Sequence, residues 1–141
     1  MTTRMPDGTQ SDLQELTAYL EAQPEVLAAV VFGSAAAGRL RPESDLDLAV
    51  LFADDGVPDA FAALELRAAQ EQRAGRDVDL IVLNRAPTIL AFQAAKKGQL
   101  IFCRDPRAYQ RYIVRLISEY ADFKRIRRPI EEAVLKRRIY D

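Results

Sequence analysis

Two kinds of hydrophobic periodicity alternate along the chain. Apolar or alternating runs rich in β-branched residues predict strands, and apolar residues spaced three or four apart predict helices. The alternation of the two predicts an α/β (α+β) fold, in which a small mixed β-sheet is flanked by helices and followed by C-terminal helices. The expected strands cover residues 26–32, 45–52, 77–83 and 99–103. The expected helices cover residues 11–23, 58–73, 87–97 and 109–123, then a break at Arg128-Pro129 and a last helix over 130–139.

Cap and stop residues place the boundaries of these elements. Ser11 with Gln14 has the form of a capping box, which predicts that the first helix begins there. Gly75 and Gly98 follow two of the helical segments as stop signals. Cys103 ends an apolar strand segment, and we expect it to be a core cysteine rather than a reactive thiol.

Length and composition are those of one folded unit. The chain has 141 residues, of which 49% are apolar and 29% are charged. We expect a single domain over residues 1–141, with a core of about residues 11–103 and a helical extension of about residues 104–141. No apolar run approaches the roughly 20 residues of a membrane span. A soluble protein of the cytoplasm with no membrane partner is therefore expected.

The residue counts restrict the chemistry that this chain can perform. It has no histidine, no tryptophan and one cysteine. These counts exclude a Ser-His-Asp triad, a Cys-His pair and a zinc site built on histidine or on several cysteines. Any catalysis must therefore depend on carboxylates.

Charge divides unevenly along the sequence. Residues 1–103 hold 9 Lys or Arg against 15 Asp or Glu, and residues 104–141 hold 11 against 6. A basic segment of this kind suits a nucleic acid or an acidic protein surface, and it also suits a solvated helix face. No recognised RNA- or DNA-binding motif accompanies it, so direct nucleic-acid binding is not expected.

The first candidate site is the pair Gly33-Ser34, which follows an apolar strand and precedes an alanine-rich stretch. A glycine lets the backbone approach a ligand, and a helix N-terminus presents free N–H groups to a phosphate. The same dipeptide also forms ordinary turns and helix caps. On these two residues alone, both interpretations stay open.

The second candidate site is a set of paired aspartates. Asp45 and Asp47 are two residues apart on one expected strand, so their carboxylates share a face, and Asp77 and Asp79 repeat the pattern on another. Each pair suits a solvent-facing edge or a Mg²⁺ ion, which takes one or two carboxylates plus substrate phosphates. If the two strands are neighbours, three acids beside a phosphate-binding turn supply the parts for two-metal nucleotidyl transfer.

These residues carry a resemblance to a known family. Gly33 and Ser34, ten further residues, and then Asp45 and Asp47 resemble the GS-x10-D-x-D signature of the DNA polymerase β-type nucleotidyltransferase superfamily. The likeness covers about residues 11–103. The short chain with its helical tail is most similar to minimal nucleotidyltransferases of the MntA antitoxin type, whose members are encoded beside a HEPN-domain ribonuclease toxin.

The resemblance implies transfer of AMP from ATP to a tyrosine of such a toxin, which neutralises it. It implies that Gly33 and Ser34 hold the triphosphate and that Asp45 and Asp47 coordinate two Mg²⁺ ions. Asp79 would bind the catalytic ion and help to activate the attacking hydroxyl. The toxin and ATP are the partners that this resemblance implies.

Two points of the match leave alternatives open. Asp77 competes with Asp79 as the third acid, although the apolar residues after Asp79 match the family strand better. Members of this type often have arginines after the Gly-Ser pair, where this chain has alanines at 35–37. Arg39 or Arg41 is the candidate to supply the phosphate-binding charge instead, with a solvated loop arginine as the alternative for each.

Two other functions stay open on the sequence. A non-catalytic antitoxin would neutralise the toxin by occlusion through its basic C-terminal segment, and the alanines at 35–37 motivate this hypothesis. A nucleotidyltransferase acting on a small molecule such as an aminoglycoside is the third. The length of the chain leaves little room for the acceptor domain that such enzymes usually carry.

Overall fold

The computed structural model describes residues 7–33 and 45–140, and it describes the side chains of residues 13–33 and 45–125. Within these ranges the strands form one four-stranded sheet of order β3-β2-β1-β4. β1 is antiparallel to both β2 and β4, and β2 is parallel to β3. The sheet is therefore mixed, as the sequence predicts. The strands are β1 (Val26–Phe32), β2 (Leu46–Phe52), β3 (Val78–Val82) and β4 (Gln99–Cys103).

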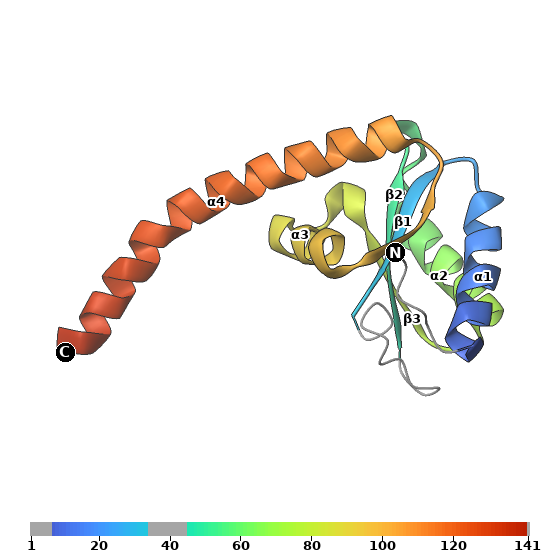
Figure 1. Cartoon of the computed structure of the whole chain (residues 1–141), viewed down its shortest axis with the longest axis horizontal. Coiled ribbons are helices and arrows are strands. Elements are labelled where there is room, and N and C mark those ends of the chain that lie inside the picture. Colours follow the sequence, from blue (N-terminus) through green and yellow to red (C-terminus); the bar gives the residue numbers. More distant parts are fainter. Residues whose placement is uncertain (1–6, 34–44, 141) are drawn as a thin grey trace.

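Helices cover both faces of this sheet. α1 and α2 lie on one face, and α3 with the first turns of α4 lies on the other (Figure 1). Two short 3-10 helices follow β2 and β3. The bounds are α1 (Asp7–Glu21), η1 (Asp54–Gly56), α2 (Ala60–Ala74), η2 (Leu83–Arg85), α3 (Thr88–Lys97) and α4 (Pro106–Tyr140).

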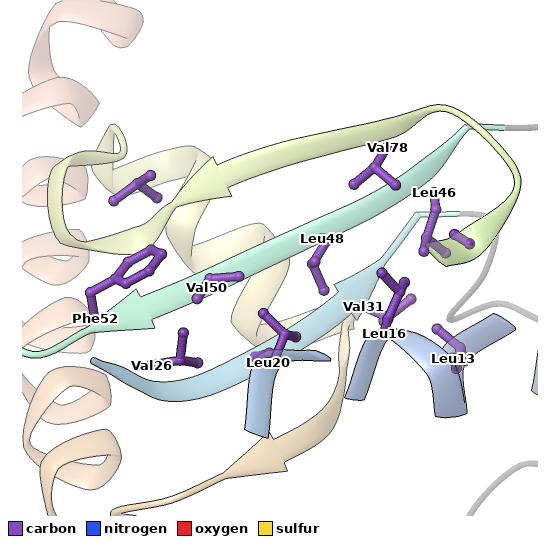
Figure 2. Close-up of a cluster of buried hydrophobic side chains, with 13 residues drawn as sticks. Leu13, Leu16, Leu20, Val26, Val31, Leu46, Leu48, Val50, Phe52 and Val78 are labelled. Atoms are coloured by element: carbon purple, nitrogen blue, oxygen red, sulfur yellow. The ribbon is translucent and has the colours of Figure 1, made fainter. Parts of the chain in front are cut away.

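Alternation along β2 builds the two halves of the core. Figure 2 shows the side chains of Leu48 and Val50 on the same side of the sheet as Leu16 and Leu20 of α1. All four are fully buried, and as apolar side chains they need no hydrogen-bond partner. Successive side chains of a strand point to opposite faces, and Ala49 accordingly packs into the second cluster beneath α3 and α4.

The second cluster includes aromatic side chains of α4. Tyr112 is buried and donates a hydrogen bond from its hydroxyl to the Leu83 carbonyl at 3.0 Å. Burial raises the pKa of Tyr112 to about 12. Tyr120 stacks on Phe92 of α3 with ring centroids 3.9 Å apart. Cys103 packs against this cluster but is only half-buried, so it is less enclosed than the core cysteine that the sequence predicts.

The largest errors in the predicted helices are the break within α4 and the start of α1. α4 continues without a break past Arg128-Pro129, because a proline removes one backbone hydrogen bond and bends a long helix without having to end it. Figure 1 shows α4 leaving the body and curving along its length. α1 begins four residues before Ser11, so Ser11 lies inside the helix and is not its cap. A capping signal marks where a helix can start, and the preceding residues extend it here.

None of the helices described combines the length and the apolar character that crossing a bilayer requires.

Candidate functional site

Three strands meet at one end of the sheet. β2 and β3 are parallel and both begin there, and the antiparallel β1 ends there. The main chain ties the two parallel strands together at this end, because the Leu46 N–H donates to the Asp77 carbonyl at 2.9 Å. We call this end the acidic rim, and it consists of Gly33, Asp45, Asp47, Asp77 and Asp79.

Strand register places Asp47 at the centre of the acidic rim. Asp47 is the register partner of Asp79 on β3 and of Phe32 on β1. Paired residues of neighbouring strands project to the same face. Since Leu46 and Leu48 pack under α1, Asp47 and Asp79 project to the opposite face, where α3 and α4 pack. The predicted neighbouring of the two aspartate strands is confirmed.

The remaining acids lie beside this pair. Asp45 comes directly before β2 and Asp77 directly before β3, so the predicted strands each begin one residue too early. Asp45, Asp77 and Asp79 are exposed, whereas Asp47 is half-buried. Burial raises the pKa of Asp47, and the nearby carboxylates of Asp79 and Asp45 raise it further. The ionised Asp47 therefore stands in an unfavourable environment that a cation would relieve.

This environment predicts a pH-dependent effect on stability. The folded pKa of Asp47 lies above its unfolded value, so ionised Asp47 destabilises the fold at neutral pH, and this penalty fades as pH falls through the folded pKa. In EDTA at pH 7, we expect Asp47→Asn to melt at a higher temperature than the wild type. The difference should close near pH 4, around the ordinary carboxyl pKa of about 3.9. Melting curves between pH 4 and 8 measure it.

The matched control is Asp55→Asn, which removes an exposed carboxylate from η1, at the other end of β2. It should leave the melting temperature unchanged at both pH values. A lower melting temperature for Asp47→Asn than for the wild type at pH 7 would contradict the unfavourable environment of this carboxylate.

Gly33 lies directly against the Asp47 side chain at the acidic rim. Its φ is +70°, in the left-handed region that glycine adopts without strain. A Cβ added there would collide with the Asp47 carboxylate, so the absence of a side chain is what lets the two approach. The other predicted phosphate-binding residues, Ser34 and Arg39, lie outside the described residues, as does Arg41.

The donors at the rim suit a hard divalent cation. Carboxylate oxygens are the ligands that Mg²⁺ takes in proteins, usually one or two together with substrate phosphates. Within residues 13–33 and 45–125, no three acidic, cysteine or histidine side chains already converge as a complete ligand set. A cation bound at the rim would stabilise the ionised form of Asp47, whose pKa is raised by burial and by the carboxylates of Asp79 and Asp45.

A further pair of charged residues at this end was missed in the sequence. Arg67 donates from Nε to Glu71 Oε1 at 3.0 Å, and the same oxygen accepts the Val78 N–H at 3.3 Å. Hydrogen bonds from Arg67 and then from Val78 lower the pKa of Glu71. In the sequence, an Arg and a Glu four residues apart indicate only a solvated helix face. The packing of α2 on the sheet places them beside β3, the strand that carries Asp79.

Fold and site together define the class of this protein. A mixed sheet with aspartates on adjacent parallel strands, beside a glycine that ends a third strand, is the arrangement of a nucleotidyltransferase. The family model described as "Polymerase beta, Nucleotidyltransferase" matches residues 14–107. The chain therefore belongs to the polymerase beta nucleotidyltransferase family.

Individual relatives narrow this assignment. The chain is 30% identical over 112 residues to the protein adenylyltransferase MntA of Shewanella oneidensis. The aligned residues cover 79% of this chain and 78% of that protein. It is similar to a crystal structure of a toxin-antitoxin with AMP-PNP, with a TM-score of 0.76 and 28% identity over 87% of this chain and 98% of that chain. A tri-AMPylated Shewanella oneidensis HEPN toxin in complex with an MNT antitoxin matches with a TM-score of 0.72 and 26% identity over 90% and 98%.

Proposed function

We propose that this protein is an antitoxin that transfers AMP from ATP to a tyrosine hydroxyl of a HEPN-domain toxin and so neutralises it. The observation that carries the proposal is the register of the rim, which sets Asp79 opposite Asp47 beside a glycine turn. The family, the adenylyltransferase relative and the AMP-bearing toxin complex support the same chemistry. Because the reaction consumes ATP, we place it in the cytoplasm.

The proposal gives a role to each rim residue except Asp77. Asp45 and Asp47 would hold Mg²⁺ as two ions, with Asp79 as a further ligand of one of them. Gly33 and Ser34 would hold the triphosphate, with Arg39 adding positive charge. A bound Mg²⁺ ion supplies charge stabilisation to the phosphates and lowers the pKa of a coordinated hydroxyl.

The chain's own groups then define the reaction. The acceptor hydroxyl oxygen attacks the α-phosphorus of ATP, the bond to the bridging oxygen of the β-phosphate breaks, and pyrophosphate leaves. Asp79 is exposed at the edge strand of the described sheet, where an acceptor can reach it. Its carboxylate is the proposed acceptor of the hydroxyl proton. Gly33 contributes by leaving the space that lets Asp47 stand against the turn.

Intact mass spectrometry of the toxin tests this function. The toxin encoded beside this protein is incubated with Mg²⁺, ATP and either the wild type or the double variant Asp45→Asn, Asp47→Asn. Mass increments of one or more adenylates with the wild type alone are the expected result. Toxin that stays unmodified, yet binds both proteins and is inhibited by both, would indicate neutralisation by occlusion and overturn the proposal.

A further inference from the structure

One face of α2 carries exposed apolar side chains that the fold does not use. Phe61 is 73% exposed and Leu64 is 61% exposed. Ala68 is also exposed, and the spacing of the three places them on one side of the helix. We call these three residues the α2 apolar face. Large apolar side chains gathered on a surface in this way mark sites of protein contact.

Arg67 lies next to the α2 apolar face, and hydrogen bonds position it at the β3 edge of the sheet. Along β3, backbone N–H groups point alternately toward β2 and away from it, and the N–H of Val78 is one that points to the open edge. Glu71 Oε1 accepts this N–H at 3.3 Å and the Arg67 Nε–H at 3.0 Å. A single oxygen therefore fixes Arg67 against the residue that lies between Asp77 and Asp79.

The terminal nitrogens of Arg67 are available to bind a ligand. Among the described residues its hydrogen-bonded partner is Glu71, which uses Nε and leaves the two terminal nitrogens for a ligand. The side chain is 47% exposed. The hydrogen bond to Glu71 raises the pKa of Arg67, and the carboxylates of Asp79 and Asp77 contribute in the same direction. The guanidinium thus lies on the α2 side of β3 and Asp79 projects to the other face, so the two groups flank the same edge strand. Its terminal nitrogens suit a carboxylate or a phosphate.

We propose that the α2 apolar face and Arg67 form the docking surface for the acceptor protein, with Arg67 binding an anionic group next to the acceptor hydroxyl. This inference rests on the proposed function. β3 is an edge strand of the described sheet, so an acceptor reaches Asp79 past that edge. α2 packs on β3, on the face of the sheet opposite to Asp79. The hydrogen bonds of Glu71 with Arg67 and with the Val78 N–H join the Arg67 end of this surface to the β3 backbone between Asp77 and Asp79, and this link to the rim assigns the surface to the acceptor protein.

The anion has two possible sources with the same chemistry. One is an acidic side chain near the acceptor tyrosine, and the other is the phosphodiester of an adenylate that is already attached. The toxin in the related complex is tri-AMPylated, so an acceptor that already carries adenylate is a relevant substrate. If Arg67 binds a carboxylate, removing its charge slows the first transfer. If it binds the phosphodiester, removing its charge leaves the first transfer unchanged and slows the later ones.

The apolar part is tested with the double variant Phe61→Ser, Leu64→Ser. We expect the KM for the toxin to rise at least about tenfold, since exposed aromatic and aliphatic anchors carry much of the energy of an interface. The kcat and the rise in melting temperature with ATP and Mg²⁺ should stay as in the wild type. The matched control is Val114→Ser, Ile117→Ser on α4, whose side chains are 64% and 52% exposed. It should leave all three quantities unchanged.

The charge is tested with Arg67→Gln and with Arg67→Lys, which keeps the positive charge. In time courses of toxin mass, Arg67→Gln should slow either the first or the later transfers at least about tenfold, which identifies the source of the anion. Arg67→Lys should restore most of the rate. Arg73→Gln, in the last turn of the same helix, is the control and should behave as the wild type.

The outcomes separate this inference from the proposed function. If the wild type adds no adenylate to the toxin, the proposed function falls and this surface falls with it. If the wild type adds adenylate and both test variants do so with unchanged KM and time course, only the docking surface is overturned. It is also overturned if the α4 control raises the KM for the toxin as much as the α2 variant does. The docking surface is overturned, too, if the α2 variant changes the self-association of this chain and leaves the KM for the toxin unchanged.

Discussion

Asp79→Asn is expected to lower the rate of adenylyl transfer on the order of a thousandfold, because it removes the carboxylate proposed to bind metal and to accept the hydroxyl proton, a role worth several kcal/mol in the transition state. The physical reason is register. Asp79 is the partner of Asp47 across two parallel strands, and its charge contributes to raising the pKa of Asp47. The measurement is the initial rate of AMP incorporation into the toxin at saturating ATP and Mg²⁺.

Asp77→Asn is the matched control for this prediction. Asp77 is also exposed and precedes β3, but the strand register begins after it with Leu46 against Val78. Its substitution is expected to change the rate by no more than a few fold, and both variants should melt close to the wild type because both side chains lie at the surface. A large loss with Asp77→Asn and a small one with Asp79→Asn would transfer the role of third acid to Asp77.

Much of the fold follows from the local pattern of the sequence. The four strands and the two helices between them lie within two residues of their predicted bounds, because apolar runs and stop signals decide such elements locally. The continuation of α4 through Pro129 was not predictable in this way. A proline is a strong break signal in a short window, and a 35-residue helix tolerates one lost hydrogen bond.

The site was predictable to the extent that it depends on spacing. Asp45 and Asp47 are neighbours along the chain, and their pairing with a later aspartate strand requires only that the two strands lie side by side. The sequence favours Asp79 over Asp77 through the apolar residues that follow it, and the register of Leu46 with Val78 adds that Asp79 lies opposite Asp47. Arg67 could not be found at all, since its approach to β3 depends on where α2 packs on the sheet.

Gly33→Ala should combine a loss of stability with a larger loss of activity. A non-glycine residue in the left-handed region costs about 1–2 kcal/mol, and Gly33 has a φ of +70°. The added methyl group would also collide with the Asp47 carboxylate, which has to move to make room. Displacing a reacting group by about 1 Å can cost on the order of a hundredfold in rate. Denaturant unfolding and the rate of AMP transfer measure the two effects.

Gly75→Ala separates the two causes, because it imposes the same backbone conformation without the collision. Gly75 has a φ of +68°, and no heavy atom lies within 4 Å of a Cβ built there. It should therefore lose a similar 1–2 kcal/mol of stability, roughly the cost of the left-handed conformation, and keep the wild-type rate at a temperature where both variants are folded. Equal rates for the two alanine variants would show that Asp47 tolerates displacement. A selective loss in Gly33→Ala would tie the reaction to the position of that one carboxylate, since strain alone is common to both.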